Sequence, residues 1–156
     1  MSECTINQVG TKQWHKNGLL HCDDGPAIEF SDGDKEWWVN GKKHRDDGPA
    51  IEYANGDKEW WVNGKLHRDD GPAVKWWLGN EWWYQHGELH RLDGPAIINI
   101  DGTKMWYKNG LQHREDGPAT EYPWGEIEWW LNNKKYTDDE FVLLQFSKGI
   151  TTNECV

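Results

Sequence analysis

The residues best suited to chemistry recur as one short cluster, His-Arg-x-Asp, along the chain. All four arginines, Arg45, Arg68, Arg91 and Arg114, stand at its second position, and an aspartate follows each of them two residues later. Guanidinium groups bind phosphates and carboxylates in bidentate fashion, so this column could form a cationic stripe for a nucleotide or an acidic peptide. The alternative is local, with arginine neutralising an acidic residue of an adjacent unit and histidine bonding a turn carbonyl. We favour the local interpretation, because a column present in every copy of a repeat serves a need of every copy.

No other pattern predicts catalysis or metal binding. His44 and Asp47 are close in sequence, but a metal site needs three or four converging ligands. The chain shows no serine or cysteine paired with a base, no paired-carboxylate motif outside the repeated glutamates, and no glycine-rich phosphate loop. We therefore predict a non-enzymatic protein with no catalytic residues, no metal and no cofactor.

Composition narrows the range of partners. The 156 residues include 17 basic and 27 acidic side chains, a formal net charge of −10. This charge disfavours binding to double-stranded nucleic acid or to an anionic membrane surface. No apolar run reaches the length of about 20 residues that a membrane helix needs, and residues 1–10 lack the apolar core of a signal peptide. Three cysteines without a metal or disulfide spacing favour a reducing cytoplasm.

The elements that position these residues come from a strict internal repeat of 23 residues. One tryptophan column keeps this spacing through all six copies: Trp14, Trp37, Trp60, Trp83, Trp106 and Trp129. Histidine, glycine and proline columns keep the same step through five copies, and the sixth copy is degenerate, with Asn133 and Tyr136 replacing the glycine and the histidine. Each unit is therefore expected to be one structural module stacked on the previous one.

Each unit is predicted to be a β-hairpin. In residues 50–62, strand-forming residues flank Asn55-Gly56, which is typical of a two-residue type I′ turn. Further turns are expected at Asn63-Gly64 and at each Asp-Gly-Pro, which leaves no room for a helix between residues 11 and 136. A two-residue turn would pair Glu52 with Glu59 and Ile51 with Trp60, placing Ile51, Tyr53, Trp60 and Val62 on one buried face.

The opposite face would then carry a second aromatic column beside a row of glutamates. This arrangement could bind a basic partner through cation–π contacts and carboxylate pairing, or the rings could simply be additional core. The candidate anchors are Trp38, Trp61, Tyr84, Tyr107 and Trp130, and the candidate acidic rim is Glu36, Glu52, Glu59 and Glu128.

The third unit offers an alternative small-molecule site. Four tryptophans lie within eight residues on either side of a turn, and flat rings stack on nucleobases with little sequence specificity. The residues of this alternative site are Trp76, Trp77, Trp82, Trp83, Arg68 and Arg91.

The repeat unit resembles the variant MORN-type repeats, W-x-x-x-G-x-x-H-R-x-D-G-P-A, of bacteriophage and giant-virus proteins. The resemblance extends over residues 11–136, about four-fifths of the chain, with Cys22 replacing the arginine in the first unit. It implies an elongated, twisted antiparallel array of β-hairpins and, more distantly, a viral origin. MORN arrays in general are linked to protein and phospholipid binding, but the net charge argues against carrying over the lipid part.

The ends of the array are expected to differ from the repeats. Residues 1–10 would form an N-terminal arm or cap, residues 11–136 the five full units and the degenerate sixth, and residues 137–156 a capping helix and tail. The helix is predicted over about residues 138–147, because Thr137 to Glu140 matches a capping box and an apolar run follows. It would cover the last strand or, alternatively, mediate dimerisation.

The sequence thus predicts an all-β repeat protein whose function is binding. The favoured partner is a host protein with a basic surface, engaged and inhibited in the host cytoplasm by a virus-encoded monomer or homodimer. The alternatives are capture of a nucleotide-like molecule and a structural role in a virion or an assembly.

Overall fold

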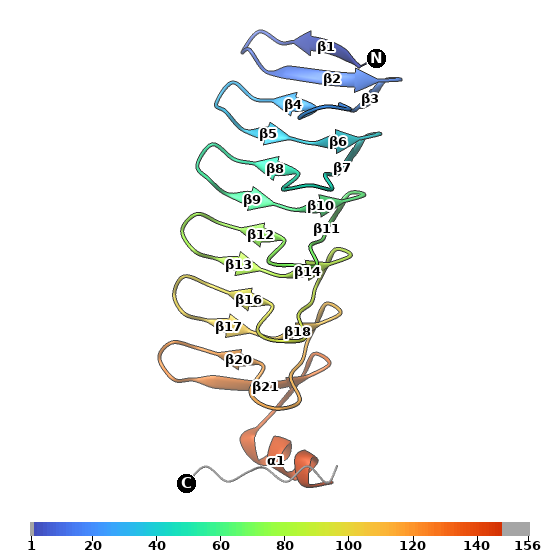
Figure 1. Cartoon of the computed structure of the whole chain (residues 1–156). Coiled ribbons are helices and arrows are strands. Elements are labelled where there is room, and N and C mark those ends of the chain that lie inside the picture. The colour runs from blue at the N-terminus through green and yellow to red at the C-terminus, as the bar shows by residue number, and fades with distance from the viewer. Residues whose placement is uncertain (1, 148–156) are drawn as a thin grey trace.

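The computed structural model describes residues 2–147 and shows a long, narrow ladder of short strands (Figure 1). Among these residues, a fourteen-stranded antiparallel sheet runs the length of the molecule, four separate two-stranded hairpins flank it, and one helix closes its C-terminal end. The predicted all-β hairpin array is confirmed. No helix occurs between residues 11 and 136, as the density of turn residues predicted.

The sheet follows the chain order closely, so that neighbouring strands are also near in sequence. Its main path is β1 (Glu3–Ile6), β2 (Lys12–Lys16), β4 (Ile28–Glu29), β5 (Lys35–Glu36), β8 (Ile51–Glu52), β9 (Lys58–Glu59), β12 (Val74–Lys75), β13 (Glu81–Trp82), β16 (Ile97–Ile98), β17 (Lys104–Met105), β20 (Thr120–Glu121), β21 (Ile127–Leu131) and β22 (Lys134–Tyr136). Off this path, β3 (Leu19–Leu20) pairs with β2.

The four flanking hairpins continue the strands of the sheet after a single unpaired residue. They are β6 (Trp38–Val39) with β7 (Lys42–Lys43), β10 (Trp61–Val62) with β11 (Lys65–Leu66), β14 (Tyr84–Gln85) with β15 (Glu88–Leu89), and β18 (Tyr107–Lys108) with β19 (Leu111–Gln112). In the third unit, for example, the Trp60 carbonyl accepts from the His67 amide, whereas the Trp60 amide donates to the Ala73 carbonyl. The segment that runs back along Trp60 is therefore interrupted. Its two parts pair at His67 and at Ala73, and residues 68–72 between them leave the sheet as a loop.

The two Asn-Gly sequences of the unit form different turns, and this corrects the predicted register. Asn63-Gly64 is the two-residue turn, with φ of 52° and 79°. At Asn55-Gly56 only the glycine has positive φ, and the Tyr53 amide donates to the Asp57 carbonyl across a three-residue loop. The pairing is therefore Ile51 with Glu59 and Glu52 with Lys58, one residue away from the prediction.

This shift redistributes the side chains between the faces of the sheet. A shift of one residue exchanges the face of every side chain on the shifted strand. The predicted face with Ile51, Tyr53, Trp60 and Val62 together is wrong: Ile51 and Tyr53 share a face with Trp61 instead. The predicted pairing of like charges is also wrong, because Glu52 lies opposite Lys58 and Lys35 in the sheet.

The core is formed mainly by two adjacent residues per unit, an alanine and, in most units, the residue that follows it, such as Ile51, Val74 or Thr120. Ala27, Ala50, Ala73, Ala96 and Ala119 are completely buried, whereas neither tryptophan column is. Each alanine follows the Asp-Gly-Pro loop directly and accepts a backbone hydrogen bond from the tryptophan of the preceding strand.

Successive units are joined by side chains that recur at the 23-residue step. The Nδ1 atom of each repeated histidine accepts the backbone N–H of the next unit's hairpin turn, as in His90 with Asn109 at 3.1 Å. At the opposite end of the unit, the Asp57 carboxylate accepts the backbone N–H of Trp77 at 2.8 Å. The sequence suggested that histidine bonds a carbonyl, but its ring accepts a hydrogen bond from an amide instead.

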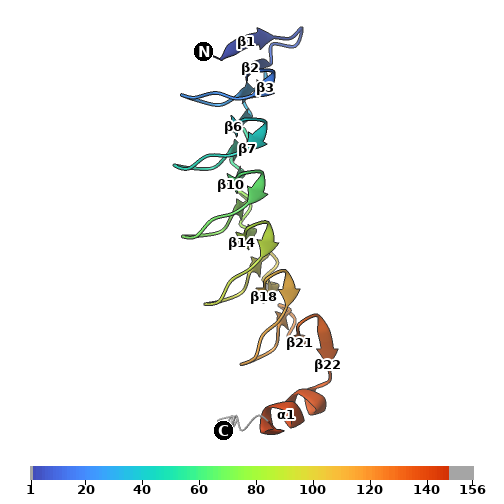
Figure 2. The same cartoon turned by 90° about the vertical axis from the view of Figure 1, so that its right-hand side faces the viewer.

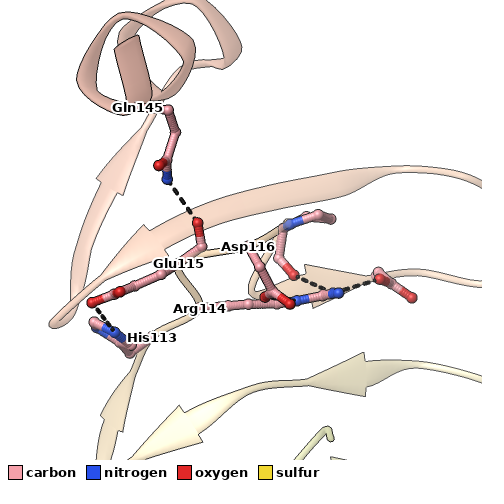
Figure 3. A network of polar contacts seen from close by, with 7 residues as sticks. His113, Arg114, Glu115, Asp116 and Gln145 are labelled. Atoms are coloured by element: carbon pink, nitrogen blue, oxygen red, sulfur yellow. Dashed lines mark hydrogen bonds and ion pairs between the residues drawn. The ribbon is translucent and has the colours of Figure 1, made fainter. Parts of the chain in front are cut away.

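The ends of the ladder follow the predicted capping pattern in part. The helix α1 (Asp138–Ser147) begins with the expected capping box between Thr137 and Glu140. Phe141 is buried against Trp129, and the Gln145 amide donates to the Glu115 carbonyl (Figure 3). At the N-terminus, β1 pairs with β2 as an edge strand. The predicted helix stop and C-terminal tail, from Lys148 onward, lie outside the described residues.

The stacking role of the histidines predicts that His90→Ala destabilises the array by about 1 kcal/mol, because the Asn109 amide loses its acceptor. The control is Glu88→Gln, at an exposed position of the flanking hairpin in the same unit. Urea unfolding followed by tryptophan fluorescence measures both variants. Equal stability of the two variants would contradict the role.

Candidate binding faces of the array

The sheet presents two chemically distinct faces. Trp60 and Trp61 are adjacent in an extended segment and therefore point to opposite sides. We call the side of Trp60, where the His-Arg-x-Asp-Gly-Pro loops lie, the loop face, and the side of Trp61 the aromatic face. Figure 2 views the ladder from the side of the flanking hairpins and shows the loops extending to one side of it.

On the loop face, every arginine lies flat over the tryptophan of its own unit. The guanidinium carbon is 4.1 to 4.2 Å from the ring centroid in all four units. Its nitrogens donate to the aspartate two residues later, at 2.8 to 2.9 Å, and to the carbonyl of the loop proline. In two units a glutamate also accepts, as Glu121 does from Arg114 (Figure 3). The guanidinium groups therefore stabilise the fold, although their partners lie in their own units rather than in adjacent ones.

The loop glycine is required by the arginine. A Cβ atom added to Gly117 would lie 2.8 Å from the Arg114 guanidinium carbon, and the equivalent contacts in the other arginine-containing units are 3.0 to 3.1 Å. In the first unit, Cys22 replaces the arginine, and a Cβ atom added to Gly25 would meet nothing within 4 Å. The chain therefore contains its own comparison between a crowded and an open version of this loop.

The arginines also set the ionisation of the loop aspartates. The hydrogen bond from the neighbouring guanidinium, reinforced by its charge, holds the pKa of Asp47, Asp70 and Asp93 below the usual 3.8. In the first unit, where the arginine is missing, His21 and then Lys16 lower the pKa of Asp23 in a similar way. These carboxylates remain ionised and point into solvent at neutral pH.

Successive loops enclose four equivalent clefts of about 480 to 630 Å³. Each has a loop as either wall, and the first-column tryptophan of the intervening strand lies on its floor, as Trp60 does between the loops of Arg45 and Arg68. Figure 3 shows one wall of the last cleft, formed by Arg114, Glu115 and Asp116.

The aromatic face contains the predicted anchor column. Its tryptophans donate their indole N–H to a glutamate two residues earlier: Trp38 to Glu36, Trp61 to Glu59 and Trp130 to Glu128, at 2.8 to 2.9 Å. The five anchors are half-buried and lie side by side along one edge of the sheet.

Where the anchor is tyrosine, the partner position changes with it. Tyr84 follows Trp82, and Tyr107 follows Met105, so that the glutamate is replaced where no indole N–H needs an acceptor. This joint change shows that each pair acts as one packing unit.

The predicted acidic rim is largely neutralised within the protein. Glu36 pairs with Lys43, Glu52 with Arg45, and Glu128 with Lys135. Glu52 lies on the loop face and does not belong to this rim. Within residues 2–147, Glu59 is the one rim carboxylate that forms no ion pair; it accepts hydrogen bonds from Trp61 and Tyr53 instead.

The pKa of the Tyr53 hydroxyl reflects its closeness to Glu59. Burial, followed by the nearby charge of Glu59, raises the pKa of the Tyr53 hydroxyl to about 12. Glu59 is thus a half-buried carboxylate set between the Tyr53 and Trp61 rings, and Lys43 lies over the Trp61 ring, 5.2 Å from its centroid.

The middle of the aromatic face is apolar. Directly paired residues form a row across the sheet that runs from Glu59 through Val74, Trp82, Ile97, Met105 and Thr120 to Glu128, without a charge between its two ends. Beside this row, Tyr84 pairs with Leu89, Trp61 pairs with Leu66, and Trp76 packs on Trp82 with ring centroids 4.6 Å apart. We call this group the apolar band. The sequence prediction of the site missed Leu66, Leu89 and Met105, because the wrong register placed the rows incorrectly.

The alternative tryptophan–arginine site is not assembled. Trp76 and Trp82 belong to the aromatic face, whereas Trp83 lies under Arg91 on the loop face. Trp77 is 64% exposed beside a turn, and Arg68 covers Trp60, which is not one of the four rings of the predicted site. The six residues therefore do not converge on one ligand.

Two further searches concern metals and membranes. Residues 2–147 contain no group of three or more His, Cys, Asp or Glu side chains placed to hold a metal ion. The one helix of this region is too short and too polar to span a bilayer.

The crowding at the loop glycine predicts that Gly117→Ala destabilises the protein by about 1 to 3 kcal/mol, because Arg114 must leave its position on Trp106. Gly25→Ala is the matched control and should leave the stability unchanged. Thermal and urea unfolding measure both variants. Equal losses in the two variants would show that the arginine is not the cause.

The lowered aspartate pKa values predict a loss of stability in acid. Because these carboxyls have a lower pKa in the folded than in the unfolded protein, their contribution is present above about pH 4 and disappears as the pH falls further. The Asp47→Asn, Asp70→Asn and Asp93→Asn triple variant should be less stable than wild type at pH 6, with the difference shrinking below pH 4. Urea midpoints across this range provide the measurement, and a constant difference would contradict it.

No protein-family model matches the chain, and no curated protein shows significant sequence similarity to it.

Proposed function

We propose that the protein is a non-enzymatic binding protein that holds a partner protein against its aromatic face. The apolar band supports this proposal. Aromatic and aliphatic side chains lie together in the middle of one sheet face, half-buried apart from the buried Val74. No second layer of residues 2–147 lies over this face (Figure 2). Contiguous apolar surface of this kind marks interaction sites in soluble proteins.

The anchor column suits a relatively flat partner. Tryptophan and tyrosine dominate binding energies at protein interfaces, because a large rigid ring is buried at small entropic cost. The indoles of Trp38, Trp61 and Trp130 already have their N–H groups satisfied by glutamates, so a partner can cover them without leaving a polar group unpaired.

Glu59 is the reason why we expect the partner to carry a positive charge at the interface. A lysine or arginine that reaches this carboxylate would gain a charge-assisted hydrogen bond next to the Trp61 ring. The net charge of −10 would also speed the approach of a basic protein. We therefore retain a basic surface as the expected chemistry of the partner, with one main contact in place of the predicted acidic rim.

The resemblance to viral MORN-type repeats adds the biological setting of the proposal. In that setting the partner is a host protein in the host cytoplasm, and binding blocks it. Nucleotide capture is the weaker proposal, because its tryptophans and arginines lie apart and its guanidiniums are engaged by aspartates.

The test is native mass spectrometry of tagged protein recovered from host lysate, with three variants compared to wild type. Trp61→Ala removes an anchor and Glu59→Gln removes the charge, whereas Trp77→Ala removes an exposed ring at a turn and is the control. A stoichiometric protein should be retained by wild type and Trp77→Ala and bound about tenfold to a hundredfold more weakly by Trp61→Ala. Glu59→Gln, which preserves shape, should also weaken it.

Three results would contradict the proposal. A protein bound equally by all four forms would exclude the aromatic face, and a small added mass lost on denaturation would favour ligand capture. The bare mass alone would favour a structural or assembly role. The thermal stability of each variant is measured alongside. If Trp61→Ala is unfolded, the partner binding of the Glu59→Gln variant tests the proposal.

A further inference from the structure

The clefts of the loop face form a second surface that the aromatic-face proposal does not use. In each cleft the positive side chains lie deeper than the negative ones. The arginine side chains are 21–24% exposed and lie flat on the tryptophans, whereas the loop aspartates that face them are 83–85% exposed. A molecule approaching the loop face therefore meets carboxylates first, with an aromatic floor between them.

The charge of the clefts changes steadily along the array. The lining residues of the first cleft carry four carboxylates and one guanidinium, because Cys22 stands where later units have arginine. The second cleft has four carboxylates and two guanidiniums, and the third has three and two. The fourth has three carboxylates balanced by two guanidiniums and Lys108. The formal charge thus rises from −3 through −2 and −1 to zero.

The spacing of the clefts selects a ligand conformation. Each unit contributes two strands to the sheet, so neighbouring clefts are about 9.5 Å apart. A polyproline II helix advances about 9.3 Å in three residues and returns every third side chain to the same side. A β-strand covers a similar distance in three residues, but it alternates its side chains and would reach only every second cleft.

We propose that the loop face binds a basic polyproline II segment of a partner polypeptide, with a lysine or arginine at every third position. Each cation would enter one cleft between two exposed aspartates, while the prolines would pack over the loops and the tryptophan floor. Aromatic-lined grooves are the usual receptors of this helix. The first two clefts carry the most negative charge, so the most basic part of the segment would lie over them, between the loops of Asp24, Asp46 and Asp69. This change in charge along the array fixes the direction in which the segment binds.

The test measures the binding of synthetic peptides to the full chain by fluorescence anisotropy at low and physiological salt. One peptide contains five Arg-Pro-Pro units, and its partner contains five arginines separated by three prolines each. The two peptides have the same charge and conformation and differ only in spacing. The period-three peptide should bind about tenfold more tightly, because only its cations match successive clefts.

A pair of protein variants locates the site. Asp24→Asn, Asp46→Asn and Asp69→Asn together remove charge from the first three clefts, and none of these carboxylates accepts from an arginine. The control removes three exposed carboxylates elsewhere: Glu88→Gln, Glu126→Gln and Asp139→Asn. The first triple variant should bind the period-three peptide about tenfold more weakly, and the control should bind it as wild type does.

Three outcomes would overturn the proposal. Equal affinity for the two spacings would exclude recognition of the repeat period, and equal losses in the two triple variants would reduce the effect to net charge. Absence of binding at low salt would exclude the site. None of these results bears on the aromatic face, so the two proposals fail independently.

Discussion

The fold depends on how a single-layered sheet shields itself from water. Other sheets bury a face against a second layer, but each unit here must cover its own strands. It does so by sending residues 68–72 and their equivalents out of the sheet and folding them back, with arginine flat on tryptophan and alanine buried beneath. The alanine, the loop glycine and the loop aspartate are all consequences of this one contact.

The sequence predicted the architecture well, because its strongest signals are local. The 23-residue period, the absence of helices within the repeats and the capping box at Thr137 depend on nearby residues, and all are confirmed. The register was wrong because Asn-Gly fits two turn geometries. At Asn63 the asparagine itself adopts a left-handed conformation, whereas at Asn55 it does not, and only the structure distinguishes the two.

The candidate site was predictable only in part. The anchors share one face and are half-buried, but that face also carries Ile51 and Tyr53, which the sequence prediction had placed opposite them. Most of the glutamates beside the anchors are engaged by indoles and lysines. The joint replacement of glutamate and tryptophan by Trp82 with Tyr84, or Met105 with Tyr107, was a usable signal of that pairing. The apolar band could not be found without the register, because it consists of residues brought together across neighbouring strands.

The contact between arginine and tryptophan also indicates that the arginine column serves the fold rather than ligand binding. NMR spectroscopy of the arginine Nε–H groups tests this assignment most directly. Our account predicts that Arg45, Arg68, Arg91 and Arg114 give signals displaced from the position of free arginine and slow to exchange with water, because each Nε–H donates to an aspartate and lies near a tryptophan ring. Four overlapping signals at the position of free arginine, exchanging rapidly, would contradict it and restore the cationic stripe as a binding surface.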